Sequence, residues 1–226
     1  MDFISDAKFL AIGPEYVYMR EFDQKRYRTS DFADAGIHMP ETIQRSVPKR
    51  QAEFLAGRIA ARDALQAMGI EADKQIPIGE QRAPVWPQHV VGAISHTDTM
   101  AIALTKPKTD GQIVGLDLEK LIDAAHCRSL ENMLLTPKEM HRLAVLDAPA
   151  AVQLTLTFSA KESLFKAIYP EVRQYLDFLD SEVVAVDTAA QIISLRMTRA
   201  VGQTQFRSQY DVHFRRFDNQ IATLLI

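Results

Sequence analysis

TFSAKESLFKAIYP, residues 157–170, has the spacing of apolar side chains that predicts a packed α-helix, which we expect to end at Pro170. Glu162 and Lys166 lie four residues apart on a second face, so the helix holds a carboxylate and an ammonium close together. A purely structural explanation exists for these residues. Ser159 and Glu162 have the spacing of a capping box, and Glu162 with Lys166 that of a surface ion pair worth roughly 0.3–0.5 kcal/mol. The rest of the chain decides between this explanation and a functional one.

The composition is that of an ordinary globular protein with one large domain or two small ones. The 226 residues are 47% hydrophobic, and a net charge of -3 with a pI near 6.1 argues against a protein that coats nucleic acid. No apolar run approaches the roughly eighteen residues that span a bilayer, and the Met-Asp-Phe start lacks the basic region of a signal peptide. Cys127 is the single cysteine, so no internal disulfide can form. We therefore expect a cytoplasmic protein with no membrane span and no nucleic-acid partner.

A basic helix is predicted over residues 46–68. Ser46 is the expected N-cap, Pro48 lies in the first turn, and Gly69 stops the helix. Between positions 45 and 62, five basic side chains stand against one acid, Glu53, although the chain is acidic overall. They are Arg45, Lys49, Arg50, Arg58 and Arg62. Two explanations stay open: a solvated helix face, or a set of guanidiniums that binds phosphate through the bidentate geometry of arginine.

Two short apolar runs, residues 90–95 and 100–105, predict a pair of strands joined by a turn. Ser95 and His96 end the first strand. Neighbours on a strand point to opposite faces, so these two cannot form a Ser-His dyad, and a lone histidine here is by default a hydrogen-bonded structural group. Arg82 lies in the loop before the strand pair.

The run IVGLDLE, residues 113–119, predicts a strand on which Asp117 and Glu119 share one face with Gly115. Two carboxylates that close repel each other, and a bound cation resolves the repulsion. Oxygen ligands of this kind favour magnesium or manganese, with positions left for water and substrate phosphates. The alternative is two solvent-facing acids at the end of a strand.

Helices precede strands twice along the chain. The basic helix comes before the strands just described, and the helix expected over residues 152–168 comes before an antiparallel meander. The strands of this meander are expected at residues 182–186, 191–197, 206–215 and 221–225. A further helix start is predicted at Thr136 in the sequence TPKE. The order favours an α+β fold of two similar halves, with mostly antiparallel strands and packed helices, over a parallel α/β sheet.

Four segments carry a resemblance to a known family. They are RQAEFLAGRIAARDAL (50–65), GAISH (92–96), GLDLE (115–119) and FSAKESLFKA (158–167). In order and spacing they resemble the motifs of the 4'-phosphopantetheinyl transferases, and most closely the monomeric surfactin and enterobactin type. A D-x-E motif alone would be weak evidence, whereas FSAKESLFKA is the most diagnostic of the four.

The resemblance implies a pseudo-twofold α+β fold whose halves, residues 1–116 and 117–226, meet around a coenzyme A site. It implies the transfer of 4'-phosphopantetheine from coenzyme A to a serine of an apo acyl, peptidyl or aryl carrier protein. The reaction would depend on Mg²⁺ or Mn²⁺ and release adenosine 3',5'-bisphosphate. The modified carrier proteins would belong to siderophore synthases or to other secondary-metabolite synthases. Such carriers are acidic helical bundles, and we expect residues 120–150 to dock them.

The same resemblance implies roles for individual residues. The metal would be bound by Asp117, Glu119 and Glu162. The catalytic residues would be Glu162, as base or mainly as metal ligand, and Lys166. Coenzyme A would contact Arg50, Arg58, Arg82, Ser95, His96, Asp117, Lys161 and Lys166. Two departures stand out: Ala93 occupies the position of a common serine, and Arg82-Ala83-Pro84 replaces Gly-Lys-Pro, which bears on how the 3'-phosphate is held.

Two other functions were weighed against this one. Paired carboxylates and arginines would equally serve another magnesium-dependent phosphotransferase or phosphohydrolase that acts on a nucleotide, although no P-loop sequence occurs. A non-catalytic module that binds carrier proteins would keep the same fold, but all the expected acids are present.

Overall fold

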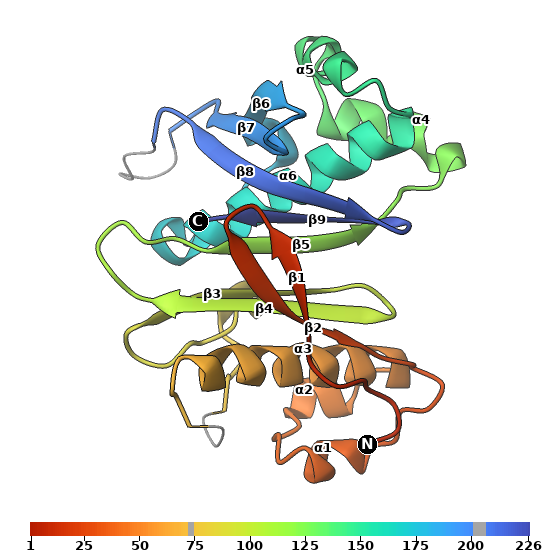
Figure 1. Cartoon of the computed structure of the whole chain (residues 1–226), viewed down its shortest axis with the longest axis vertical. Coiled ribbons are helices and arrows are strands. Elements are labelled where there is room, and N and C mark those ends of the chain that lie inside the picture. The colour runs from red at the N-terminus through yellow and green to blue at the C-terminus, as the bar shows by residue number, and fades with distance from the viewer. Residues whose placement is uncertain (72–74, 201–206) are drawn as a thin grey trace. The chain divides into compact units, whose positions relative to one another are not determined.

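The structure is a computed structural model that describes residues 1–71, 75–200 and 207–226. The chain divides into two compact units (Figure 1). Unit 1 comprises Met1–Ala11 and Glu15–Gln112, and unit 2 comprises Ile12–Pro14 and Ile113–Ile226. The division falls after Gln112, so the strand that carries Asp117 and Glu119 belongs to unit 2 as a whole.

Unit 1 is built on a four-stranded sheet of order β1-β2-β4-β3. Its strands are β1 (Lys8–Ile12), β2 (Glu15–Glu21), β3 (Val90–His96) and β4 (Met100–Pro107). The helix α3 (Pro48–Ala67) packs on β2, β3 and β4. Shorter elements are α1 (Asp31–Asp34), α2 (Glu41–Gln44) and the 3-10 turn η1 (Glu80–Arg82). The predicted strand pair is confirmed, because β3 and β4 are antiparallel neighbours.

Helix α3 is the predicted basic helix, with Pro48 at its first position and Gly69 just past its end. Gly69 has a φ of +74°, a left-handed conformation that glycine adopts without steric cost. The predicted N-cap is wrong: Val47 occupies the cap position, and the Ser46 hydroxyl donates instead to the carbonyl of Thr42 at 2.9 Å. Since α2 ends directly before Ser46, the preceding helix takes the hydroxyl that would have capped α3.

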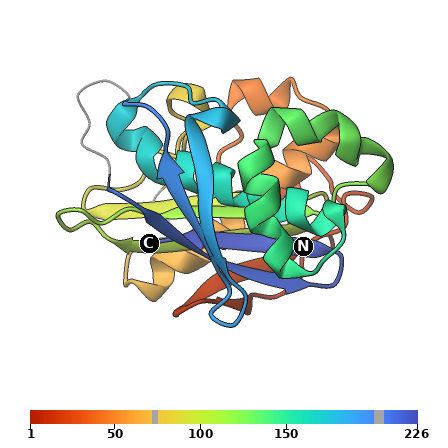
Figure 2. The ribbon, with the colours of Figure 1, turned by 90° about the horizontal axis from the view of Figure 1, so that it is seen from above.

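Unit 2 is built on a five-stranded sheet of order β5-β9-β8-β7-β6, in which every pairing is antiparallel. Its strands are β5 (Gly115–Lys120), β6 (Ser181–Asp187), β7 (Ile192–Met197), β8 (Tyr210–Phe217) and β9 (Gln220–Leu225). The long helix α6 (Ala150–Val172) lies along the sheet, with α4 (Ala124–Leu134) and α5 (Pro137–Leu143) beside it (Figure 2). Two 3-10 turns are η2 (Ala144–Leu146) and η3 (Phe178–Asp180). The meander is confirmed; position 206 of the predicted third strand lies outside the described residues.

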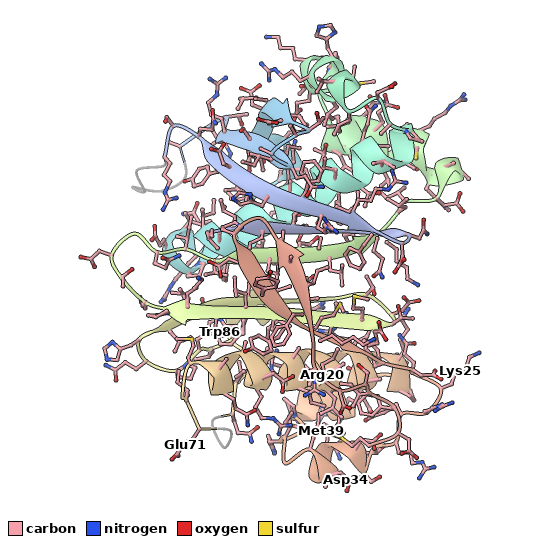
Figure 3. The ribbon with its side chains drawn as sticks, viewed as in Figure 1. Arg20, Lys25, Asp34, Met39, Glu71 and Trp86 are labelled. Atoms are coloured by element: carbon pink, nitrogen blue, oxygen red, sulfur yellow. The ribbon has the colours of Figure 1, made fainter. Side chains whose placement is uncertain are left out.

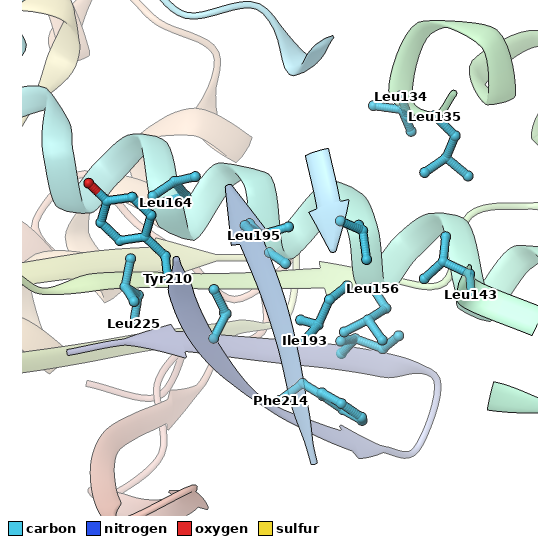
Figure 4. Packing of buried hydrophobic residues seen from close by; sticks show 14 of the residues in the cluster. Leu134, Leu135, Leu143, Leu156, Leu164, Ile193, Leu195, Tyr210, Phe214 and Leu225 are labelled. Atoms are coloured by element: carbon cyan, nitrogen blue, oxygen red, sulfur yellow. The ribbon is translucent and has the colours of Figure 1, made fainter. Parts of the chain in front are cut away.

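The core of unit 2 forms where α6 meets the strands. Figure 4 shows Leu156 and Leu164 of α6 among Ile193, Leu195 and Phe214 of the sheet, all buried. Each unit thus has an antiparallel sheet covered by one long helix, which confirms the prediction of an α+β fold with two similar halves.

Helix α6 differs from its prediction at both of the proposed ends. It continues through Pro170 to Val172, because a proline in the last turn removes only one late helical hydrogen bond. Ser159 and Glu162 lie in the middle of the helix, so the capping-box explanation for them is wrong. The cap predicted at Thr136 is confirmed: its side chain and that of Glu139 satisfy each other's backbone N–H groups at the start of α5.

No single helix in the described part of the chain is long and apolar enough to cross a membrane. By length and composition alone, one bent pair passes that test, Pro137–Leu146 with Ala150–Val172, whose two parts meet at 111°.

Candidate active site

Gly115 allows α6 to lie directly against β5. A Cβ atom at Gly115 would sit 1.8 Å from the carbonyl oxygen of Ser163 and 2.9 Å from the Cβ of Ala167. Hydroxyl groups fix the same contact on the neighbouring strand, since Ser159 and Ser163 lie 2.9 and 2.7 Å from the Thr223 hydroxyl. These buried contacts set the distance between the helix that carries Glu162 and the strand that carries the D-x-E motif.

Asp117 and Lys166 meet across this contact. The Nζ of Lys166 donates to Oδ1 of Asp117 at 2.6 Å and to the carbonyl of Leu116 at 3.1 Å. The Asp117 side chain is only 3% exposed, so the explanation as a solvent-facing acid is wrong for this residue. Lys166 is likewise not a simple surface cation, because it is held at the strand by a charge-assisted hydrogen bond.

Glu119 and Glu162 complete a group of three carboxylates with Asp117. Burial, together with the negative charges of Asp117 and Glu162, raises the pKa of Glu119 to about 8, although the positive charge of Lys166 opposes the rise. Burial also raises the pKa of Glu162, with Lys166 opposing and Asp117 adding to the rise. The three acids predicted from the sequence therefore lie close enough to repel one another. Perturbed carboxylates of this kind are typical of functional sites.

The donor chemistry of this group fits a hard divalent cation, since carboxylate oxygens are the ligands that Mg²⁺ prefers. In the present arrangement of side chains the positive charge comes from Lys166. Among the described residues, no three His, Cys, Asp or Glu side chains are grouped closely enough to hold a metal ion as they stand. The oxygen donors nearest to this requirement are Asp117, Glu119 and Glu162, and the assignment of a metal to them stays a prediction.

Lys161 lies away from these acids, although it precedes Glu162 in the sequence. Its Nζ donates to the carbonyl of Leu134 at 2.8 Å and pairs with Oε1 of Glu139 at 2.8 Å. The two charged side chains are 2% and 0% exposed. Burial lowers the pKa of Lys161, and the hydrogen bond to Glu139 opposes the change. Because its ammonium is committed to this pair, we do not place Lys161 among the coenzyme contacts that the sequence led us to expect.

A small hollow of about 50 Å³ lies between α6 and the segment that follows it. Glu162, Phe165 and the stem of Lys161 line one side, and Tyr175 and Phe178 line the other. This hollow could not be predicted, because residues 173–180 have no periodic pattern.

In unit 1, the structure brings Arg50 and His96 together. Arg50 Nη1 donates to Nε2 of His96 at 2.8 Å, and the same guanidinium lies 3.5 Å from Glu53. Ser95 precedes His96 on β3 and is buried. Trp86 (Figure 3) covers this strand, since its indole N–H donates to the carbonyl of Gly92 at 2.8 Å.

Arg58 is buried in unit 1 at the wall of a cavity of about 480 Å³. Its Nε donates to the carbonyl of Ile76 at 2.9 Å, and its guanidinium lies 4.4 Å from the centre of the Phe54 ring. Burial, together with the like charge of Arg50, lowers the pKa of Arg58 to about 10. Arg62 also lines the cavity, so two guanidiniums and an aromatic ring surround one space. The explanation of a fully solvated basic helix face is therefore wrong for Arg58.

Arg82 is an exposed residue of η1 and does not line this cavity. It has a φ of +63°, and Gln81 before it has a φ of +49°. The two successive left-handed residues turn the chain sharply, which explains why the sequence alone could not place this side chain.

Comparisons with known proteins place both parts of the chain in one family. Residues 39–106 match the 4'-phosphopantetheinyl transferase N-terminal domain, and residues 113–224 match the 4'-phosphopantetheinyl transferase superfamily. Enterobactin synthase component D of Escherichia coli (strain K12) is 41% identical over 76% of this chain and 79% of its own. The chain belongs to the 4'-phosphopantetheinyl transferase superfamily.

Other relatives of this transferase extend the similarity. Enterobactin synthase component D of Salmonella typhimurium is 32% identical over 92% of this chain and 85% of its own. The 4'-phosphopantetheinyl transferase Svp of Streptomyces mobaraensis is 36% identical over 69% of this chain and 62% of its own. The enzyme class expected from the four sequence motifs, 4'-phosphopantetheinyl transferase or holo-[carrier protein] synthase, is thus confirmed.

Proposed function

We propose that this enzyme transfers the 4'-phosphopantetheine group of coenzyme A to a serine of an apo carrier protein, with Mg²⁺ or Mn²⁺ as cofactor. The observation that carries the proposal is the group of Asp117, Glu119 and Glu162 beside Lys166 on the contact between β5 and α6. A metal ion bound there would polarise the diphosphate of coenzyme A and neutralise part of its charge.

Glu162 and Lys166 are the residues that we assign to the chemical step. A carboxylate whose pKa is raised by burial is a stronger base, so Glu162 would accept the proton of the carrier serine. The serine oxygen then forms a bond to the phosphorus next to pantetheine. The bond from that phosphorus to the bridging oxygen breaks, and adenosine 3',5'-bisphosphate leaves with the electron pair. Lys166 would supply positive charge to the phosphate oxygens as they reorganise.

The nucleotide end of coenzyme A is assigned to unit 1. Its cavity of about 480 Å³ is within the usual size of small-molecule sites, about 300–1,000 Å³. Arg58 and Arg62 line it, which favours an anionic ligand with a flat base that can pack on Phe54. Arg50, Ser95, His96 and Arg82 remain further proposed contacts for the phosphates.

The carrier protein is assigned to a surface of α4, α5 and η2 that we call the docking surface. It consists of the exposed apolar residues Met133, Met140 and Val145 with the exposed cations Arg128 and Lys138. Exposed apolar side chains together with these two cations would suit an acidic helical partner. Because relatives are named for enterobactin synthase, we propose a carrier of a siderophore synthase as partner. We propose that the enzyme acts as a monomer.

The decisive experiment is intact-mass analysis of apo carrier proteins after incubation with coenzyme A, Mg²⁺ and the enzyme. We expect an added mass of one phosphopantetheine group, which requires coenzyme A and is lost when EDTA removes the metal. Absence of the adduct on siderophore, other peptide-synthetase, polyketide and fatty-acid carriers would refute the proposal. Thermal stabilisation by ATP but not by coenzyme A would instead favour a different nucleotide-dependent phosphotransferase.

A further inference from the structure

The buried ion pair of Lys161 and Glu139 joins four segments of unit 2, which are α6, α4, α5 and β6. Lys161 belongs to α6, and its ammonium donates to the carbonyl of Leu134, the last residue of α4. Glu139 belongs to the first turn of α5, where its Oε2 accepts hydrogen bonds from the backbone N–H and the hydroxyl of Thr136. Its Oε1 also accepts from the backbone N–H of Val183 on β6 at 2.9 Å. One pair of charges therefore fixes the corner between α4 and α5 to both the helix and the sheet.

Stability alone is a poor explanation for this pair. Taking two charges out of water has a large free-energy cost, and a well-packed apolar pair of the same volume is often as stable. Unlike apolar packing, the ion pair is directional, because each of its charge-assisted hydrogen bonds fixes the relative position of one donor and one acceptor. The ammonium also faces the end of α4, where a positive charge is favoured by the helix dipole.

Lys161 and Glu162 are neighbours on α6, so the fixed corner and the proposed base are held by the same helical turn. The corner lies between Met133 and Met140, two residues of the docking surface. A displacement of the corner would therefore move the docking surface relative to Glu162 without moving Glu162 relative to Asp117.

We infer that Lys161 and Glu139 are positioning residues that align the docking surface, and hence the carrier protein, with Glu162. This inference rests on the proposed function. It differs from a role of Lys161 in binding coenzyme A, because it predicts that the two residues act as one unit and affect the carrier protein selectively.

The test compares Lys161→Met, Glu139→Gln and the double variant in steady-state transfer, with carrier protein and coenzyme A varied separately. We expect the KM for the carrier to rise about tenfold in each, equivalent to about 1.4 kcal/mol, with the KM for coenzyme A unchanged within about twofold. The double variant should be no worse than Lys161→Met alone, because both changes remove the same link. A short unstructured peptide that carries the acceptor serine should react equally with wild-type enzyme and variants.

Arg196→Gln is the matched control, since Arg196 forms an exposed ion pair with Glu182 on the same sheet and should change neither KM. If a single variant fails to fold because a charge is left buried alone, the double variant removes both charges and still permits the measurement. A rise in the KM for coenzyme A with Lys161→Met, but not with Glu139→Gln, would overturn the inference in favour of a coenzyme contact. Lower thermal stability with both KM values unchanged would also overturn it. Failure of the proposed function is distinguishable, because wild-type enzyme would then form no adduct at all.

Discussion

Replacing Gly115 by alanine should separate the two elements that carry the acid group. The added Cβ would lie 1.8 Å from the carbonyl oxygen of Ser163, whereas ordinary contacts of a Cβ begin near 3.4 Å. The difference, 3.4 minus 1.8, is 1.6 Å, and the obstructing atom is backbone, so the backbones of α6 and β5 must move apart. Glu162 directly precedes Ser163 and Lys166 follows it within one helical turn, so both would be displaced relative to Asp117 and Glu119.

The expected effects of Gly115→Ala are on both stability and rate. Forcing extra volume into a packed contact typically costs about 1–3 kcal/mol, and we expect the upper end because a side-chain rotation cannot relieve this contact. A displacement of about 1 Å at a catalytic group can lower the rate by about a hundredfold. Urea unfolding gives the change in stability, and the initial rate of carrier modification at saturating substrates gives the change in kcat.

Gly57→Ala is the control for this substitution. Its Cβ would meet only the Cγ2 of Ile94, at 3.1 Å, and alanine is favoured over glycine inside a helix by about 1 kcal/mol. Near-normal stability and rate are therefore expected. If Gly115→Ala also kept its rate and lay within about 0.5 kcal/mol of the wild-type stability, the close approach of α6 to β5 would not position the acids.

Three further predictions concern single residues. Because the pKa of Glu119 is raised to about 8, metal binding must release its proton at lower pH, so the affinity for Mg²⁺ should rise with pH up to about 8 and then level off. Without metal, the folded state binds the Glu119 proton more tightly than the unfolded state does, so the free energy of unfolding should fall as the pH rises from the ordinary pKa of 4.5 to about 8. Thermal melts across this pH range, with and without Mg²⁺, measure both effects. Melting temperatures that do not change with pH would contradict the raised pKa. Glu162→Gln and Glu119→Ala should abolish transfer with no loss of stability, as measured by mass analysis and urea unfolding, whereas an active variant would remove that residue from the site. Arg58→Ala should raise the KM for coenzyme A by about tenfold at little cost in kcat, and an unaltered KM would remove Arg58 from the nucleotide site.

The acids and the strand pattern could be predicted because they depend on short-range periodicity. Alternation along β5 places Asp117 and Glu119 on one face, and helical spacing places Glu162 and Lys166 on one face of α6. Each of these two predictions depends only on residues that are close together in the sequence. The same reason explains why the cap at Thr136 was predicted correctly, since both of its partners lie within one turn.

The remaining features depend on partners that are distant in the sequence. Glu139 as the partner of Lys161, Thr223 as the partner of Ser159 and Ser163, and Ser163 as the neighbour of Gly115 have no local signal. A local rule failed at Pro170, because a proline this close to the end of α6 removes only one late helical hydrogen bond.

The order of strands in unit 2 has a consequence for how the enzyme is made. β5 forms the edge of its sheet beside β9, and Asp117 is in register with Thr223. The two pairing residues are roughly a hundred positions apart, and closing so long a loop makes this one of the slower steps of folding. The strand that carries two of the three acids can therefore be held in place only after β9 has been synthesised and paired. Catalytic competence should be among the last properties that a newly made chain acquires.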